Sequence, residues 1–325
     1  MEPVPPAFYD AAAVARWLDY PGGVAAMREA MVALSEEPVA QPARTILPVG
    51  AAGLFGVMPG SFAASLGFGA KLVGVFPDAA RPGRSRHHGV VALFDADSGA
   101  MVALADAEAL TTIRTACATV AASLALARRD AAVLAIFGCG TQARSHIAAF
   151  AAAMPIGELI IWGRDAARAE ALAQEARSQF GLTARAECDG RAAAQAADII
   201  CTVSGASAPI LSGDWVRPGT HVNLVGSSYL GPSEADSALV CKSRYIADYR
   251  TSALAAAAEF AIARDAGLID DTHIAAEIGQ VFAGTVSGRR CDSDITLYKS
   301  LGHVAQDLAA LGYLDRRATT ESPCP

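Results

Sequence analysis

A glycine-rich turn at residues 138–143, Gly-Cys-Gly-Thr-Gln-Ala, has the residue types needed to bind a dinucleotide. In this G-x-G-x-x-A pattern the first glycine permits a tight turn, the second lets the backbone approach a pyrophosphate, and the alanine allows close helix-to-strand packing. The turn follows an apolar run, 132–137, and opens a helical stretch, 142–152, whose N-terminal amides would attract phosphate. The pattern therefore predicts a dinucleotide site rather than an ordinary tight turn, formed by Gly138, Gly140, Thr141, Gln142 and Ala143.

The choice of dinucleotide depends on residues that lie beyond the glycine turn. About 20 positions after such a turn, an acid binds the ribose 2′-hydroxyl or an arginine accommodates a 2′-phosphate. The sequence there is Gly163-Arg164-Asp165, after the apolar run 158–162. The planar guanidinium of Arg164 suits phosphate oxygens, which favours NADPH, with NADH possible. Asp165 is either the ribose acid or the cap of the helix that begins at Ala166.

Three basic residues stand in apolar or small-residue surroundings. They are Arg44, before the strand-like run 45–49, Lys71, at the start of another such run, and Arg114, within a helical stretch. If they converge, they form a cationic pocket for a small carboxylate, in which an arginine can bind both oxygens. Three separate ion pairs with the chain's own acids are the simpler interpretation of the spacing alone.

Two small-residue segments follow strands of the expected parallel sheet. Ser204 to Pro209 follows the run Ile199–Val203, and Gly226-Ser227-Ser228 follows the run 220–225. Ligands of open parallel sheets lie beyond the carboxyl ends of the strands. Both segments are therefore expected to border the nicotinamide.

The sequence contains no pattern typical of a metal site or of a disulfide framework. Adjacent histidines on a strand point to opposite faces, so His87 and His88 are interpreted as a polar pair in a loop. The cysteines are odd in number and form no C-x-x-C pair, which indicates reduced thiols. They are Cys117, Cys139, Cys188, Cys201, Cys241, Cys291 and Cys324.

Periodicity predicts two kinds of structure along the chain. Residues 8–36 have helical spacing, residues 43–104 form short strand-like runs separated by Pro, Gly and Asp, and residues 106–129 return to helix and could link two domains. From residue 132 strands and helices alternate, which predicts a doubly wound parallel sheet. The alternating segments are strands 132–137, 158–162, 183–188, 199–203 and 220–225, and helices 142–152, 166–180 and one before Asp198. The region after Ser252 is expected to be mostly helical, and 316–325 a disordered tail.

Composition excludes several classes of partner. The formal net charge is −7 with no basic cluster, so nucleic acid is not an expected partner. No run approaches the roughly 18 to 20 uninterrupted apolar residues of a membrane span, and the acidic, proline-rich start is unlike a secretory signal. We therefore expect a soluble protein of the cytoplasm with two domains.

Over almost its full length the chain resembles the ornithine cyclodeaminase/mu-crystallin family. The resemblance is carried by the segments GFGAKLVGVF, HGVVALFD, LTTIRTACATVAAS, FGCGTQA, VNLVGSS and DITLYKSLG, which begin at residues 67, 88, 110, 137, 222 and 294. It implies an α/β fold: a Rossmann domain, 119–299, that binds NADP, and a discontinuous α+β domain, 1–118 with 300–325. The second domain would bind substrate and form a homodimer.

The resemblance also assigns roles to residues. It implies that Arg44, Lys71 and Arg114 hold a substrate carboxylate, in place of the separate ion pairs that spacing alone suggests. It adds Met58 and His88 to the substrate side and Thr115, Val203 and Ser204 to the cofactor side. Glu259 is a further candidate acid near the substrate.

Ser228 bears on the type of reaction. Cyclodeaminases of the family carry an aspartate near this position, and a hydroxyl of ordinary pKa does not replace a carboxylate base. The resemblance is therefore to the ketimine reductases, which reduce Δ1-pyrroline-2-carboxylate or Δ1-piperideine-2-carboxylate to L-proline or L-pipecolate. Lys71, Arg114 and Ser228 are the predicted catalytic residues, with Ser228 bonded to the imine nitrogen or to the nicotinamide amide. The alternatives are an amino-acid dehydrogenase acting on acyclic imines, ornithine cyclodeaminase, and a protein that binds NADPH and a small ligand without turnover.

Overall fold

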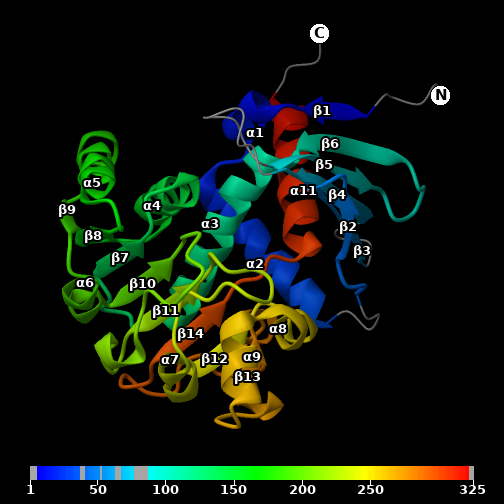
Figure 1. Ribbon diagram of the computed structural model, residues 1–325. Helices are drawn as coiled ribbons and strands as arrows, with labels where there is room; N and C mark the ends of the chain where they lie inside the picture. The colour runs from blue at the N-terminus through cyan, green and yellow to red at the C-terminus, as the bar shows by residue number, and fades with distance from the viewer. Residues whose placement is uncertain (1–5, 37–40, 52, 63–66, 77–86, 322–325) are drawn as a thin grey trace. The chain divides into compact units, whose positions relative to one another are not determined.

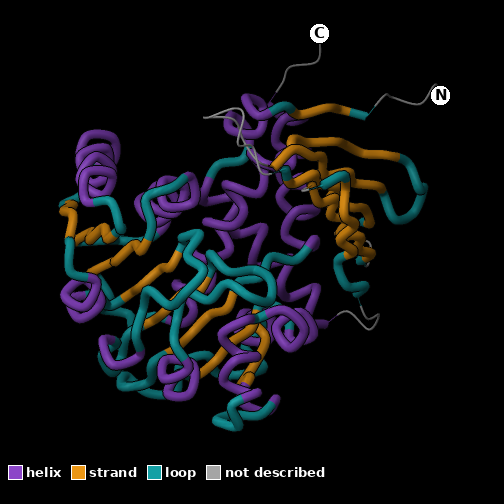
Figure 2. The backbone as a smooth tube through the Cα atoms, in the orientation of Figure 1, coloured by secondary structure: helices purple, strands orange, loops and turns teal. Residues whose placement is uncertain are grey.

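The chain forms two compact units, each built around one β-sheet (Figures 1 and 2). The computed structural model describes residues 6–36, 41–51, 53–62, 67–76 and 87–321. Unit 1 comprises Met1–Arg114 and His303–Pro325, and unit 2 comprises Thr115–Gly302. These boundaries lie four and three residues from the expected ones at 118 and 299. The predicted fold class, a Rossmann-type sheet plus a discontinuous α+β domain, is confirmed.

Unit 1 contains a six-stranded sheet of order β1-β6-β5-β4-β3-β2. Only β1 and β6 pair in parallel, and the other neighbours are antiparallel. Helix α11 packs against β3 to β6 and against α2 (Figure 1). The elements are β1 (Ala7–Tyr9), α1 (Ala11–Trp17), α2 (Tyr20–Glu36), β2 (Thr45–Val49), β3 (Gly53–Ser61), β4 (Phe68–Val75), β5 (His87–Phe94), β6 (Met101–Asp106) and α11 (Val304–Glu321).

Two predictions for the ends of unit 1 are wrong. The helix expected over 8–36 is a short strand and two helices, because α1 ends at Trp17 and Asp19 accepts from the amide of Gly22 at the start of a new helix. The tail expected to be disordered is helical as far as residue 321, since Arg317 pairs with Asp19 and with Glu321 one turn further on. Residues 322–325 lie outside the described residues.

Helix α3 (Ala107–Leu126) begins in unit 1 and ends in unit 2, as expected of a linking helix. By length and composition α3 could cross a membrane, which the search for uninterrupted apolar runs missed. In this structure 67% of its most apolar window is buried within the protein. Such burial is typical of the core helix of a soluble protein.

Unit 2 contains an eight-stranded parallel sheet of order β13-β12-β14-β11-β10-β7-β8-β9. The chain runs outward from β7 through β8 to β9 and then returns to the other side of β7 at β10, so the strand order reverses between β7 and β10. Ligands of open parallel sheets bind at such a switch point. The strands are β7 (Val133–Phe137), β8 (Glu158–Trp162), β9 (Ala184–Glu187), β10 (Ile199–Thr202), β11 (His221–Leu224), β12 (Arg244–Ala247), β13 (Ile274–Glu277) and β14 (Thr296–Lys299).

The predicted alternation holds through β11, and the region after it contains more strand than expected. The central strands β10, β11 and β14 are buried at every residue, although β11 and β14 carry polar side chains such as His221, Asn223 and Lys299. Strands β12, β13 and β14 are four residues each, and Lys299 hides β14 from a search for apolar runs. The helices of unit 2 are α4 (Thr141–Ala153), α5 (Ala166–Phe180), α6 (Gly190–Ala196), α7 (Ser237–Lys242), α8 (Arg250–Ala256), α9 (Ala258–Asp265) and α10 (Ile278–Phe282), with short 3-10 turns η1 (Gly213–Trp215) and η2 (Asp271–His273).

Candidate functional site

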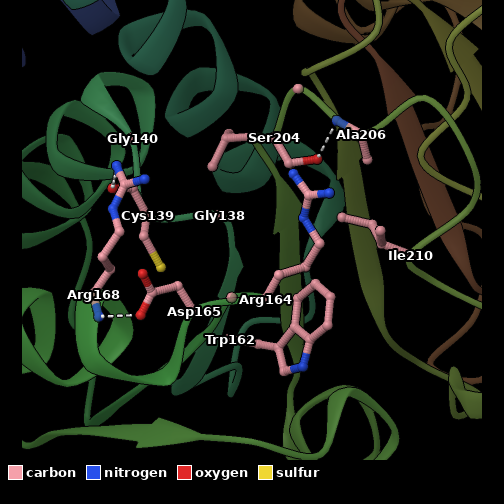
Figure 3. Close-up of a pocket in the computed structure, with 13 residues that line it drawn as sticks. Gly138, Cys139, Gly140, Trp162, Arg164, Asp165, Arg168, Ser204, Ala206 and Ile210 are labelled. Atoms are coloured by element: carbon pink, nitrogen blue, oxygen red, sulfur yellow. Dashed lines mark hydrogen bonds between the residues drawn. The ribbon is translucent and has the colours of Figure 1, made fainter. Parts of the chain in front are cut away.

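A pocket of about 280 Å³ lies at the carboxyl ends of β7, β8 and β10, beside the switch point of the sheet (Figure 3). Three segments line it: the glycine turn after β7, the residues at and after the end of β8, and the loop after β10. The lining residues are Gly138, Cys139, Gly140, Trp162, Gly163, Arg164, Asp165, Arg168, Val203, Ser204, Gly205, Ala206 and Ile210. The pocket therefore unites segments that the sequence assigned separately to a dinucleotide.

The N-terminus of α4 is open toward this pocket. Its cap residue, Gly140, makes no side-chain hydrogen bond to the first turn, whereas Asp165 and Asp189 cap α5 and α6 with their carboxylates. A Cβ atom built on Gly140 would meet no atom within 4 Å. Uncapped amides facing open space are the arrangement that binds phosphate, so these residues fit a dinucleotide pyrophosphate.

Gly138 is required by backbone geometry rather than by the ligand. Its φ is +143°, and a Cβ there would lie 2.7 Å from the carbonyl oxygen of Val203. The amide of Val203 in turn donates to the carbonyl of Phe137. Only glycine lets the turn after β7 approach the end of β10 this closely.

Two arginines and one aspartate stand at the end of β8. Asp165 accepts from the amides of Ala167 and Arg168, so it caps α5, which was one of its two expected roles. Arg164 is exposed, lines the pocket, and has no acidic partner among the described residues. The guanidinium of Arg168, one helical turn further, donates to the carbonyl of Cys139 in the glycine turn (Figure 3). Two guanidinium groups thus flank the place where a 2′-phosphate would lie.

The other expected cofactor residues do not line this pocket. Thr141 and Gln142 lie in the first turn of α4, where the buried Oε1 of Gln142 has no hydrogen-bond partner among the described residues. Ala143 is buried in the core and packs α4 on the sheet, as the third position of the motif predicts. Thr115 is buried in α3, and its carbonyl accepts from the hydroxyl of Thr119.

In unit 1 a buried acid joins two of the three basic residues. Nε of Arg114 lies 2.9 Å and Nζ of Lys71 3.5 Å from Oδ1 of Asp307 on α11, and all three residues are buried. Arg114 also donates to Gln306, and Lys71 donates to Thr111. The interpretation as three separate ion pairs is therefore wrong, because Lys71 and Arg114 share one carboxylate.

The charge of Arg44 acts on the same cluster. Burial, together with the positive charges of Arg114 and Arg44, lowers the pKa of Lys71 to about 8, although Asp307 opposes the shift. Burial together with both arginines likewise lowers the pKa of His303 to about 4, so this histidine is neutral near pH 7. The cluster therefore carries more positive than negative charge in the buried interior of unit 1.

Strand register places Met58 and His88 on opposite faces of the sheet in unit 1. Met58 pairs with Lys71 across β3 and β4, and Lys71 pairs with Val91 of β5, so these three side chains share one face of the sheet. His88 pairs with Gly74, three positions from Lys71, and therefore lies on the opposite face, exposed. It lies in β5 and not in the loop that the sequence suggested. The structure brings Met58 to the cluster but not His88.

Ser228 follows β11 and is half-buried. The residue before it, Ser227, is buried, and its hydroxyl is hydrogen-bonded on both sides. The hydroxyl of Ser227 donates to Oε1 of Glu259, and Nζ of Lys299 donates to Ser227. Lys299 and Glu259 form a buried ion pair of 2.9 Å. Burial raises the pKa of Glu259, but the charge of Lys299 together with hydrogen bonds from Ser227, Lys299 and the Glu259 amide lowers it below its usual value. Glu259 therefore lies beneath the loop that carries Ser228 and supports its backbone.

Sequence reasoning missed several residues of both sites. Arg168 follows Arg164 by one helical turn, a spacing that could have indicated it. His303, just before α11, and Asp307 within it have the same spacing, but they lie about 190 residues from Arg114 along the chain, and only folding brings Asp307 to Arg114. Among the described residues there is no cluster of His, Cys, Asp or Glu able to hold a metal ion, and the six described cysteines are free.

A glycine turn at the switch point of a parallel sheet, together with a second unit that carries a buried cationic cluster, defines a class of two-unit, Rossmann-type proteins. A model of the ornithine cyclodeaminase/mu-crystallin family matches residues 10–322, and the chain belongs to this family.

Two relatives and one solved structure are similar to this chain over most of its length. The ketimine reductase mu-crystallin of Mus musculus is 33% identical over 273 residues, 84% of this chain and 83% of the mouse protein. A Δ1-pyrroline-2-carboxylate reductase of Bacillus cereus is 32% identical over 291 residues, 89% of each chain. The Thermococcus litoralis Δ1-pyrroline-2-carboxylate reductase, solved with NADH and L-proline, has a TM-score of 0.90 and 27% identity over 97% of this chain and 98% of that chain.

The low pKa of Lys71 can be measured directly, because the chain contains only three lysines, Lys71, Lys242 and Lys299. We expect the ε-carbon signal of Lys71 in NMR of ¹³C-lysine-labelled protein to titrate near pH 8. In Asp307→Asn the pKa should fall further, because the substitution removes the negative charge that favours the ammonium form. Lys71→Arg identifies the signal by its disappearance. A Lys71 pKa above 10, or one that rises in Asp307→Asn, would contradict the clustered geometry.

Proposed function

We propose that the protein reduces a cyclic α-imino acid, Δ1-pyrroline-2-carboxylate or Δ1-piperideine-2-carboxylate, to L-proline or L-pipecolate with NADPH. The observation that carries this proposal is the buried cluster of Lys71 and Arg114 on Asp307, together with the charge of Arg44, which is near enough to lower the pKa of Lys71. When Lys71 is protonated, Lys71 and Arg114 bring two positive charges to the single negative charge of Asp307. The remaining positive charge suits a small carboxylate, and an arginine can bind both of its oxygens.

In the reduction, hydride from C4 of NADPH adds to the C=N carbon, a proton is added at nitrogen, and NADP⁺ is released. The chain's own part is binding and orientation. Arg44, Lys71 and Arg114 hold the carboxylate, which fixes the direction of the C=N bond. The hydroxyl of Ser228 donates to the imine nitrogen, directly or through water, and contact with the nicotinamide amide is compatible with this role.

The relatives support a reductase over a cyclodeaminase. Proteins named ketimine reductase and Δ1-pyrroline-2-carboxylate reductase match more than four fifths of the chain. Ser228 offers no carboxylate base at the position after β11. Glu259 does not replace that base, because it is held in a buried ion pair with Lys299.

A direct assay tests the reaction. We expect the purified protein to consume NADPH with Δ1-pyrroline-2-carboxylate and to form L-proline. Arg44→Met should raise KM for the imino acid about 10-fold to 100-fold, because a hydrogen bond between charged groups contributes roughly 1.5–3 kcal/mol. Arg185→Met removes an exposed guanidinium of unit 2 and should change neither KM nor kcat.

Parallel incubations separate the competing reactions. Ammonia release from L-ornithine with NAD would replace the proposal with cyclodeamination. Preference for acyclic imines would indicate an amino-acid dehydrogenase. Tight NADPH binding without turnover of any imino acid would indicate a binding protein.

The preference for NADPH rests on Arg164, and the structure adds Arg168 beside it. We expect Arg164→Ala and Arg168→Ala each to weaken NADPH binding about tenfold or more while NADH binding changes little, because only NADPH carries the 2′-phosphate. Fluorescence titration with both cofactors measures the difference. Equal losses for NADPH and NADH would refute the assignment.

A homodimer is proposed from the apolar β2 end of the sheet in unit 1. Ile46, Leu47, Val49, Leu54 and the neighbouring Phe76 are each 39–50% exposed. By register Ile46 and Leu54 lie on one face of the sheet and Leu47 and Val49 on the other, so both faces at this end are open. Exposed apolar patches of this kind usually mark an interface. A second copy is the proposed occupant, since an archaeal alanine dehydrogenase of the same fold is described as a dimer.

Sedimentation analysis tests the assembly. The wild type should sediment as twice 33.3 kDa, and Leu47→Glu should shift it toward the monomer, because the new charge would be buried in the interface. Leu268→Glu changes an equally exposed leucine of unit 2 and should remain dimeric. A wild-type monomer at micromolar concentration would overturn this proposal.

A further inference from the structure

Glu234, in the loop after β11, is a buried acid that none of the steps above uses. It is fully buried, and its carboxylate accepts four hydrogen bonds, two at each oxygen. Oε1 accepts from the amide and the hydroxyl of Ser204, at 2.8 and 2.7 Å. Oε2 accepts from the hydroxyl of Thr202 and the amide of Gly226, at 2.8 and 2.7 Å. Every acceptor direction of the carboxylate is therefore occupied.

These donors belong to two loops that leave neighbouring strands. Thr202 ends β10 and Ser204 begins the loop after it, while Gly226 begins the loop after β11. The two strands pair in parallel, so both loops leave the same edge of the sheet. Glu234 thus ties together the two segments that precede Ala206 and Ser228.

The contacts extend into the wall of the pocket. The hydroxyl that Ser204 donates to Glu234 accepts in turn from the amide of Ala206, a pocket residue (Figure 3). The carbonyl of Glu234 accepts from the amide of Ile210, another pocket residue, and its own amide donates to Glu259. The backbone of Glu234 is therefore hydrogen-bonded to Ile210 and Glu259, while its side chain holds the loop that lines the pocket.

A carboxylate satisfies this arrangement because each of its oxygens accepts from one backbone amide, which can only donate, although burial raises the pKa of Glu234. All four groups donate, so an amide in place of the carboxylate would turn its own N–H₂ toward donors and leave at least one of them without an acceptor. There is also little room for adjustment. A Cβ on Gly226 would lie 2.4 Å from Oε1 of Glu234 and 2.2 Å from the carbonyl of Ser204.

We propose that Glu234 is a positioning residue that presents the loops after β10 and β11 to the nicotinamide half of the bound dinucleotide. In a sheet of this order the strands on the β8 side of the switch point serve the adenosine half, and β10 and β11 serve the nicotinamide half. The inference rests on the proposed dinucleotide binding and goes beyond it, because it assigns orientation of the reacting ring to a residue that touches neither cofactor nor substrate.

The test compares Glu234→Gln with the wild type for two ligands. NADPH carries both halves of the cofactor, whereas adenosine 2′,5′-bisphosphate carries only the adenosine half with its 2′-phosphate. We expect Glu234→Gln to weaken NADPH about tenfold and to lower the single-turnover rate of hydride transfer about tenfold or more, because a buried donor is left unsatisfied. Affinity for the bisphosphate should stay within about twofold, since Arg164 and Arg168 are untouched.

Two further variants keep the result interpretable. Ser204→Ala removes one donor and the acceptor for Ala206 while the carboxylate remains, and it should give a smaller loss of the same kind if Glu234→Gln fails to fold. Glu158→Gln changes an exposed glutamate at the opposite end of β8 and should leave all three measurements unchanged. Equal loss of NADPH and bisphosphate, or no loss of either, would overturn the inference. Failure of the wild type to bind NADPH would instead overturn the proposed function.

Discussion

Buried carboxylates hold cations and loops in place at both candidate sites, and Asp307 is the one on which the substrate site depends. Lys71 and Arg114 come from different elements, and each would be unstable in the interior without an opposite charge. Removing Asp307 leaves two buried cations facing each other and Arg44, and breaking such a pair typically costs about 3–5 kcal/mol. Two cations on one acid also leave a net positive charge, which would suit the proposed carboxylate substrate.

The dinucleotide pocket depends on a different constraint, the geometry of a parallel sheet. All strand ends of one polarity meet at one edge, and the reversal of order between β7 and β10 opens a space there. The glycine turn uses that space because Gly140 caps α4 without a side chain and Gly138 allows close approach to Val203. Arg164 and Arg168 then supply charge on the β8 side.

The carboxylates of Glu234 and Glu259 accept hydrogen bonds from the loops that follow β10 and β11. Glu234 collects four donors from two strand ends, and Glu259 pairs with Lys299 and accepts from Ser227 and from the amide of Glu234. Because both acids are buried and accept hydrogen bonds from these loops, we expect a substitution of either acid to shift the loops. This is a physical reason why the residues after β10 and β11 have defined positions although they lie outside regular structure.

The sequence by itself determined the features that depend on local chemistry. The G-x-G-x-x-A turn, strand β8 and helix α5 all follow from periodicity and residue type within about 30 neighbouring positions, whereas the choice between two roles for Asp165 was left to the structure. The family resemblance joined Arg44, Lys71 and Arg114, which spacing alone could not. Tertiary structure decided what depends on distant segments: the shared carboxylate of Asp307, the placement of His88 by strand register, and the three short strands after β11. It also assigned Glu259 and Glu234 to buried networks, since the partners of a buried charge are chosen by packing and not by distance along the chain.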